Sequence, residues 1–406
     1  MSGTFQALQE GPFRRLWGGS LLATTAFMMS FMLVPSVAFD ISGSNAAAGF
    51  AQLGSGIAMV IVSPVGGVIA DRVRKKPLVL GGQLVPAVVI LVTGILILTD
   101  NITVPVLTGA TLVMGLGFAF MGPARQAWVA ELVDRPVIPN AVALQQLAMN
   151  ISQVLAPLCV ALLVGTVFDV GGAYLFMASL FVVVLPLTLS LPNTTPVAKP
   201  RRPLAADLAE GVLYVWSNRR LRTLWLGFIG IVVCGFAFQT LLPGLLAEEL
   251  GREPTDVGLI FTTLAVAGLI VNIPLAGAVR TPLAWPALLA SGAIMAVGFF
   301  LIAGAPSYAL VVAAGIPQGI GRSGFMLLDN ALLMASAEPA YHGRVMSLSM
   351  IGFGSQALLA PVWGAIADAI GVRPTLVIVG IAASAVVAAV ALSWLRTRGD
   401  VVPGGG

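Results

Sequence analysis

The stretch Gly67-Val-Ile-Ala-Asp-Arg-Val-Arg-Lys-Lys-Pro77 is a charged segment between two long apolar runs. Five of the six residues from Asp71 to Lys76 are charged, whereas the whole chain is 9% charged and 58% hydrophobic. Two interpretations are open for such a loop. It either marks only which side of a membrane it lies on, or it takes part in a movement between two helices.

The composition excludes an ordinary soluble domain, in which about 25% of residues are charged. The mean hydropathy is +0.98, and apolar runs near 20 residues recur along the chain. Each run is long enough to cross a bilayer core of about 30 Å as a helix. Apolar and polar residues do not alternate along these runs, as they would along the strands of a membrane β-barrel. The sequence therefore predicts an all-α integral membrane protein.

Pro, Gly and charged residues separate these runs into twelve predicted transmembrane helices. The longest break, 192–220, contains leucine, valine and tryptophan at helical spacing, which predicts a short amphipathic helix. Most of the 21 Lys and Arg lie on the side of the N-terminus, so the positive-inside rule predicts that both termini are cytoplasmic in a cell membrane. The predicted spans are about 16–39, 46–70, 77–99, 104–130, 139–166, 171–191, 221–247, 256–279, 283–304, 307–337, 343–370 and 374–396.

An internal repeat divides the chain into two similar halves. Several short patterns recur in order at an offset of about half the chain. We therefore expect two pseudo-symmetric six-helix bundles, 1–191 and 221–406, joined by a cytoplasmic linker, 192–220, with the substrate site between them. The matching pairs are Phe13-Arg-Arg-Leu-Trp17 with Leu221-Arg-Thr-Leu-Trp225, Gly115-Leu-Gly117 with Gly319-Ile-Gly321, and Leu155-Ala-Pro157 with Leu359-Ala-Pro361.

These features resemble the major facilitator superfamily. Its loop signature, Gly-x-x-x-Asp-Arg-x-Gly-Arg-Lys, is matched here by Gly67, Asp71, Arg72, Lys75 and Lys76. The chain departs from the signature at position 74, where an arginine replaces the usual glycine. Further stretches resemble the twelve-helix branch that exports drugs and siderophores, namely Phe13–Trp17, Gly122–Ala127 with Pro139–Ala143, and Gly343–Ser347.

The resemblance implies a cytoplasmic latch at the charged loop. It places Asp71 against the start of helix eleven, near Arg344, and pairs the basic residues of the loop with Glu131 or Asp134. The alternative is a solvated loop, in which exposed ion pairs contribute about 0–1 kcal/mol. The second half keeps a single charge at the equivalent loop, Arg280. Membrane topology thus does not require the whole set, and the latch is favoured.

Two ionisable residues fall inside the tenth predicted span. Such groups cost about 2.5–3.5 kcal/mol at mid-helix and are candidates for function. Arg322 and Asp329 lie about two turns apart on one helical face. Arg322 could bind an anionic or carbonyl-bearing substrate, and Asp329 could exchange a proton. For Asp329 the alternative is a structural ion pair, because the repeat aligns it with Arg125.

Four other polar residues are weaker candidates for substrate or proton binding. Asp40 and Glu248 are repeat equivalents at the outer ends of their helices, where they attract cations or are simply solvated. Gln239 and Gln318 lie in spans seven and ten, which line the substrate cavity in the family that the chain resembles. Hydrogen bonding between helices is the alternative role for both amides.

The sequence predicts a transporter rather than an enzyme. It has one histidine, no His-Glu-x-x-His and no phosphate-binding Gly-x-x-x-x-Gly-Lys-Ser/Thr. Cys159 and Cys234 lie in apolar runs, so we expect no metal site or cofactor, and the basic charge indicates membrane orientation rather than nucleic-acid binding. The expected function is a secondary active exporter of amphipathic, drug-like or siderophore-like molecules by proton antiport. The alternative is an importer or facilitator of a small nutrient such as a sugar or organic acid.

Overall fold

The computed structural model describes residues 5–193, 204–279, 281–338 and 341–397, without the side chains of 63–72, 123, 130, 204–208, 343, 347 and 350. Within these residues the backbone is almost entirely helical. The first bundle contains α1 (Gly11–Ser42), α2 (Asn45–Arg72), α3 (Lys75–Leu98), α4 (Val104–Leu132), α5 (Ile138–Leu163) and α6 (Val170–Leu189). The second contains α8 (Arg219–Gly244), α9 (Gly258–Ala278), α10 (Ala284–Gly304), α11 (Tyr308–Ser336), α12 (His342–Ile370) and α13 (Val372–Thr397).

Eleven helices in the described residues are long and apolar enough to cross a membrane. The twelfth predicted span is α11, which has 29 residues and packs between α9 and α10. Its mean hydropathy is lower because it carries Arg322, Asp329 and several other polar residues. The expectation of a twelve-helix membrane protein is therefore confirmed, with α11 as its most polar member.

Local signals set the helix ends. α1 is longer than the predicted span because Pro12 suits its first turn and Gly43, at φ 63°, ends it. α6 begins after Asp169, whose carboxylate accepts a hydrogen bond from the backbone N–H of Gly172 at 2.6 Å. Gly371, at φ 93°, separates α12 from α13. A non-glycine residue is strained in that left-handed region.

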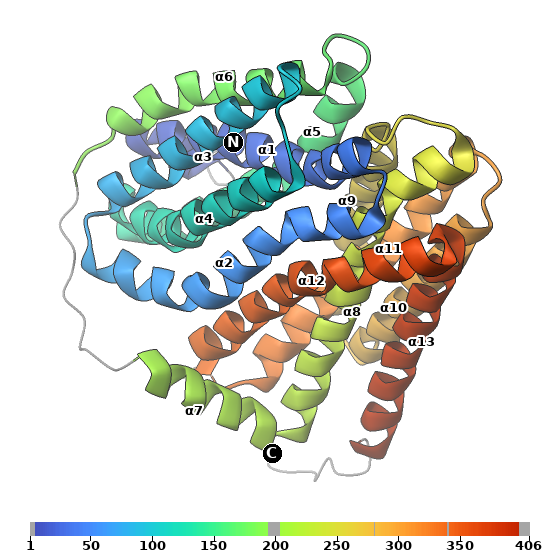
Figure 1. The fold of residues 1–406 in the computed structure, drawn as a ribbon. Coiled ribbons are helices and arrows are strands. Elements are labelled where there is room, and N and C mark those ends of the chain that lie inside the picture. Colours follow the sequence, from blue (N-terminus) through green and yellow to red (C-terminus); the bar gives the residue numbers. More distant parts are fainter. Residues whose placement is uncertain (1–4, 194–203, 280, 339–340, 398–406) are drawn as a thin grey trace.

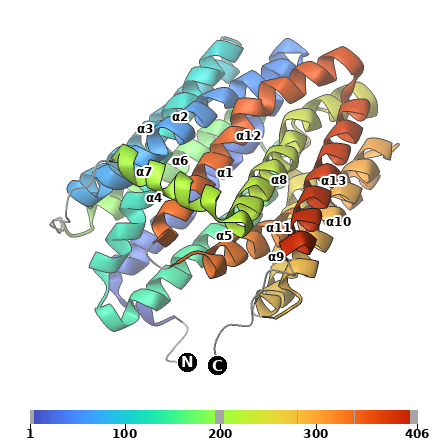
Figure 2. The ribbon, with the colours of Figure 1, turned by 90° about the horizontal axis from the view of Figure 1, so that it is seen from below.

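The linker contains the predicted amphipathic helix, α7 (Leu204–Ser217). It contacts α12 and α8 of the second bundle and also α2 of the first. Figures 1 and 2 both show α7 beside the first turns of α12. Three short turns complete the described helices, namely η1 (Gln6–Gln9), η2 (Arg135–Val137) and the π-turn η3 (Leu245–Glu249).

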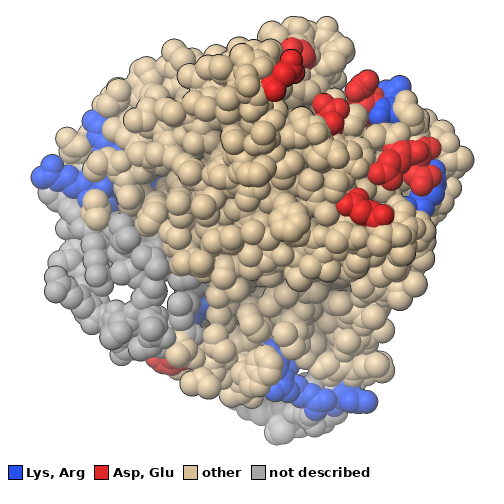
Figure 3. Space-filling view, viewed as in Figure 1, with Lys and Arg blue, Asp and Glu red and all other residues tan. Residues whose placement is uncertain are grey.

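We call the end of the molecule with the start of α1 and the end of α13 the terminal end, and the other the opposite end. The bundles meet where α2 packs on α12 and α5 packs on α9. Figure 1 shows the helices of the two bundles diverging from this contact. Figure 3 shows acidic side chains gathered at one corner of the face in view and basic ones along its left and lower edges. The opposite end carries the acids Asp40, Asp100, Asp169, Glu248, Glu249, Glu253, Asp256 and Asp368.

Candidate functional site

At the opposite end, α12 of the second bundle caps the start of α2 in the first. The Asp368 carboxylate accepts hydrogen bonds from the backbone N–H groups of Asn45, at 2.7 Å, and Ala46, at 3.0 Å. The Ser44 hydroxyl donates a third, at 2.6 Å. A carboxylate at a helix N-terminus satisfies free N–H groups and opposes the positive end of the helix dipole. Sequence reasoning did not identify Asp368, although an acid in the last turn of a predicted span was the available signal.

Polar side chains extend this contact toward the middle of the molecule. The Asn45 amide donates a hydrogen bond to Glu248 at 3.2 Å, and the Gln52 amide donates one to Thr240 at 2.8 Å. Glu248 is thus an exposed member of the contact between bundles. Asp40, its repeat equivalent, is exposed at the end of α1.

Close backbone approach holds α2 against α12. A methyl group built on Gly56 would lie 2.8 Å from Ala357 Cβ, and one on Gly364 would collide with the backbone of Asn45. Only glycine leaves room for such an approach. The two helices therefore pack tightly from the opposite end to about the position of Gly56.

The two glutamine candidates lie in different environments. The Gln239 amide donates a hydrogen bond to the backbone carbonyl of Phe31 at 2.9 Å, so it joins α8 to α1 across the boundary between bundles. Gln318 is fully buried and faces α10, where its side chain lies against Gly298. This structure therefore places Gln239 between the bundles and Gln318 inside the second bundle.

Arg322 lies on the side of α11 that faces α8. Its guanidinium carbon is 4.7 Å from the centre of the Phe236 ring. This distance is within the range of a cation–π interaction. Among the described residues Arg322 has no hydrogen-bond or ion-pair partner, and its side chain is half-buried. Its hydrogen-bond donors are thus free to bind an anion or a carbonyl group.

Asp329 is fully buried two turns further along α11. Neither carboxylate oxygen has a hydrogen-bond partner among the described residues. Phe325, one turn earlier, packs against Gly227 of α8 and Gly292 of α10. The alternative role of Asp329, a structural ion pair, therefore has no partner residue in the described part of the chain.

Its repeat equivalent, Arg125, is also buried, at 4% exposure, inside the first bundle. There its guanidinium donates hydrogen bonds to the Thr24 hydroxyl at 3.4 Å and to the Met149 sulfur at 3.9 Å. Both contacts are long and neutral. Sequence reasoning aligned Arg125 with Asp329 but did not recognise it as a third membrane-embedded charge in its own right.

At the terminal end, two lysines of the charged loop tie the first bundle together. Lys75 Nζ lies 3.3 Å from Glu131 of α4, and the two side chains are 4% and 23% exposed. Lys76 Nζ donates hydrogen bonds to the backbone carbonyls of Leu189 and Leu191, at 2.7 and 2.8 Å, at the end of α6. A cation at that position also complements the helix dipole.

Of the other residues in the charged loop, Arg74 is described in full and Asp71 and Arg72 only in their backbone. Arg74 adopts φ −56° and ψ 130°, a conformation that does not require the glycine of the family signature. Gly67 is described only as part of α2, and the side chains of Asp71 and Arg72 lie outside the described residues. Asp134 is exposed and forms no ion pair with a described residue.

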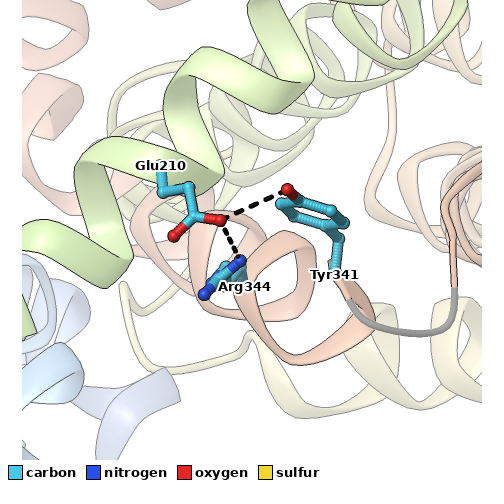
Figure 4. Close-up of polar contacts among 3 residues, drawn as sticks. All are labelled: Glu210, Tyr341 and Arg344. Atoms are coloured by element: carbon cyan, nitrogen blue, oxygen red, sulfur yellow. Dashed lines mark hydrogen bonds and ion pairs between the residues drawn. The ribbon is translucent and has the colours of Figure 1, made fainter. Parts of the chain in front are cut away.

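Arg344, the expected partner of Asp71, contacts the linker helix. Its guanidinium donates a hydrogen bond to Glu210 of α7 at 2.8 Å, and the Tyr341 hydroxyl donates another to the same oxygen at 3.2 Å. Figure 4 shows both contacts. The Tyr341 ring stacks on Tyr214 of α7 with 3.9 Å between centres and 6° between planes. This Glu210 cluster, not identified from the sequence, fixes α7 to the start of α12.

Known proteins match this arrangement of helices. Solved structures that superpose on it include a bacterial homologue of the human lysosomal transporter Spinster, with a TM-score of 0.75, 13% identity and coverage of 97% of this chain and 98% of that one. Nucleoside transporter NupG has a TM-score of 0.73 and 14% identity, with coverage of 94% and 99%. At these identities the likeness concerns the fold alone.

Relatives by sequence include proteins named for drug resistance, export or efflux. Multidrug resistance protein D of Escherichia coli K12 is 26% identical over 59% of this chain and 60% of its own length. Enterobactin exporter EntS of Escherichia coli O127:H6 is 27% identical, with coverage of 72% and 70%. Macrolide efflux protein A of Streptococcus pyogenes is 23% identical, with coverage of 83% and 84%.

A family model covers most of the chain. The description of that family is Major Facilitator Superfamily, and the match runs from residue 16 to residue 355. This range includes the charged loop, α7 and α11, and it ends within α12. The chain is therefore a multi-pass membrane transporter, not an enzyme, and it belongs to the major facilitator superfamily.

Proposed function

We propose that this transporter exports amphipathic small molecules, drug-like or siderophore-like, across the cell membrane in exchange for protons. The observation that carries the proposal is Asp329, fully buried with no hydrogen-bond partner among the described residues. A carboxylate in that setting carries a desolvation cost that protonation removes. Asp329 thus suits a step in which one proton is taken up and later released.

Arg322 and Phe236 suit an amphipathic cargo. The guanidinium supplies donors for an anionic or carbonyl oxygen, and the ring beneath it supplies apolar contact. The names of two relatives, multidrug resistance protein D and enterobactin exporter EntS, support export as the direction of transport. Proton uptake at Asp329 and cargo binding at Arg322 would occur about 10 Å apart along α11, given 1.5 Å of rise per residue.

Alternating access would use the contacts at the two ends of the bundles. We place both termini in the cytoplasm of a cell with this protein in its plasma membrane, following the positive-inside rule. The Asp368 contact then closes the outer side, and this state receives cargo from the cytoplasm. Release outside would require that contact to open while the terminal end closes, with Asp71 acting as the latch.

The test is transport by the purified full chain in proteoliposomes, with and without an imposed pH gradient. The panel contains antibiotics, siderophores and small nutrients such as sugars and organic acids. We expect movement of at least one amphipathic compound that collapses when the gradient is dissipated. Uptake of a nutrient by expressing cells, without any change in drug tolerance, would show that the protein is an importer.

A further inference from the structure

A pocket of about 370 Å³ lies at the terminal end of the second bundle, between the start of α8 and the end of α13. Three arginines, Arg219, Arg222 and Arg396, line it together with the hydroxyl groups of Thr223 and Ser393. All of its lining residues are described, and none of them is acidic. Figure 3 shows basic side chains along the lower edge of the molecule, where α8 begins and α13 ends. The pocket therefore concentrates positive charge that no lining group neutralises.

The other wall of the pocket is apolar and faces away from the centre of the molecule. It includes Leu226 of α8 and Leu392 of α13, whose side chains are 47% and 56% exposed. Leu226 precedes Gln239 by thirteen residues, which places the two on roughly opposite sides of a helix. Because Gln239 faces the first bundle, Leu226 faces outward, where a membrane protein meets lipid. The apolar side of the pocket thus lies where lipid chains would meet it.

Tryptophans beside the pocket mark the boundary between lipid tails and water. Trp285 stacks on Trp394, with 5.8 Å between ring centres and 9° between planes. Arg222 lies 5.5 Å from the Trp216 ring and donates a hydrogen bond to its backbone carbonyl at 3.2 Å. Tryptophan is enriched at the headgroup level of membranes. The three arginines therefore lie at the depth of lipid phosphates.

We propose that this pocket binds an anionic phospholipid. Guanidinium groups match the geometry of a phosphate ester with paired hydrogen bonds. Basic pockets between transmembrane helices are suited to acidic headgroups. The acyl chains would lie along Leu226 and Leu392, which a free phosphate would leave uncovered. The ligand is thus a lipid whose phosphate and chains are both used, and phosphatidylglycerol is a suitable probe.

The test measures lipid retained by the purified full chain in a neutral detergent, by native mass spectrometry. Phosphatidylglycerol and phosphatidylcholine with identical chains are compared in the wild type, in Arg219→Gln, in Arg396→Gln and in the double variant. We expect preferential retention of phosphatidylglycerol and about a fivefold weaker affinity for each arginine removed. Arg135→Gln is the matched control, an exposed arginine at the terminal end outside the pocket, and should retain the lipid normally.

Three results would overturn the proposal. Equal retention of the two lipids would show that charge does not select the ligand. Normal retention by the double variant would place the lipid elsewhere. Displacement of phosphatidylglycerol by an equal concentration of glycerol 3-phosphate would indicate a small-anion site that does not use the acyl chains. The thermal transition of each variant, measured in detergent alone, confirms that the exposed substitutions leave the fold intact.

Discussion

At the scale of single residues, two charges lie inside α11 of the second bundle, as Arg125 does inside the first. Most described ionisable side chains lie at helix ends, in water or beside a partner. Arg322 has an aromatic ring as its neighbour, and Asp329 has no polar neighbour within hydrogen-bond distance among the described residues. Keeping such groups costs stability, so each is a direct target for mutation.

Replacing Asp329 by asparagine should uncouple transport from the pH gradient. The amide has nearly the same shape but cannot exchange a proton, so we expect cargo to move only down its own gradient. The measurement is export in proteoliposomes at a series of imposed pH differences. Asp100→Asn makes the same change at an exposed residue outside the candidate site and should keep full coupling. Normal gradient dependence in Asp329→Asn would remove this residue from the proton pathway.

The Lys75–Glu131 pair permits a matched comparison of stability. Glu131→Gln leaves the Lys75 ammonium buried without its counter-charge, which typically costs about 3–5 kcal/mol. Asp134→Asn alters an exposed acid three residues away and should cost less than about 0.5 kcal/mol. Thermal unfolding in detergent compares the two variants. Equal transition temperatures would mean that the pair does not stabilise the first bundle.

At the scale of helices, α12 determines how the bundles meet. Its last turn caps α2 through Asp368, its middle packs on α2 near Gly56, and its first turn contacts α7 through Arg344. One helix therefore connects the opposite end, the middle and the linker. Substitutions at either end of α12 should change the relative populations of the conformations in which the opposite end is closed or open.

Asp368→Asn should weaken closure of the opposite end. The amide oxygen still accepts hydrogen bonds, but the charge that faces the helix dipole is lost. We expect the free energy of the closed state to rise by about 1–2 kcal/mol relative to the open state. Spin labels at Ile41 and Ile370, in a background without Cys159 and Cys234, report the separation as a distance distribution. We expect a larger population at long distance.

Asp169→Asn is the matched control for that experiment. It alters a helix-capping carboxylate at the same end, but within the first bundle. Its distance distribution should equal that of the parent. Identical distributions in all three proteins would show that the Asp368 contact does not hold this end closed.

Glu210→Gln should release α7 from α12. Two donors, Arg344 and Tyr341, meet at one carboxylate oxygen, and the amide replaces a charged acceptor by a neutral one. We expect faster backbone hydrogen exchange across α7, with little change in α8. Tyr341→Phe removes one hydrogen bond but keeps the ring that stacks on Tyr214, so its effect should be smaller. Unchanged exchange in both variants would rule out the cluster as the anchor of α7.

The sequence predicted elements better than contacts, for a physical reason. A span is a local property of about 20 apolar residues, so the helices and the linker helix could be located, as could charges within a span such as Arg322. Asp368 and Glu210 were missed because their partners lie 323 and 134 residues away along the chain. Gln318 could not be oriented either, because packing against Gly298 decides which way it faces.

At the scale of the whole molecule, we expect the charged loop to stabilise the conformation in which the terminal end is closed, and to contribute less when that end is open. Asp71→Asn should abolish most transport while expression and membrane insertion stay near normal, since only the latch of the terminal end is lost. Asp100→Asn, in a loop at the opposite end, is the control and should transport normally. Both variants are measured in the proteoliposome assay. Full transport by Asp71→Asn would leave the loop with a role in topology alone.

The position of the tight contact between α2 and α12 has a mechanical consequence. Gly364 lies near one end of α12, and about 33 Å of helix separates it from His342, at 1.5 Å per residue. If this contact acts as a fulcrum, a tilt of about 10° would swing the start of α12 through roughly 6 Å, on that same helical geometry. A small rotation beside Asn45 would thus become a displacement of several ångströms at the start of α12, where Arg344 contacts α7.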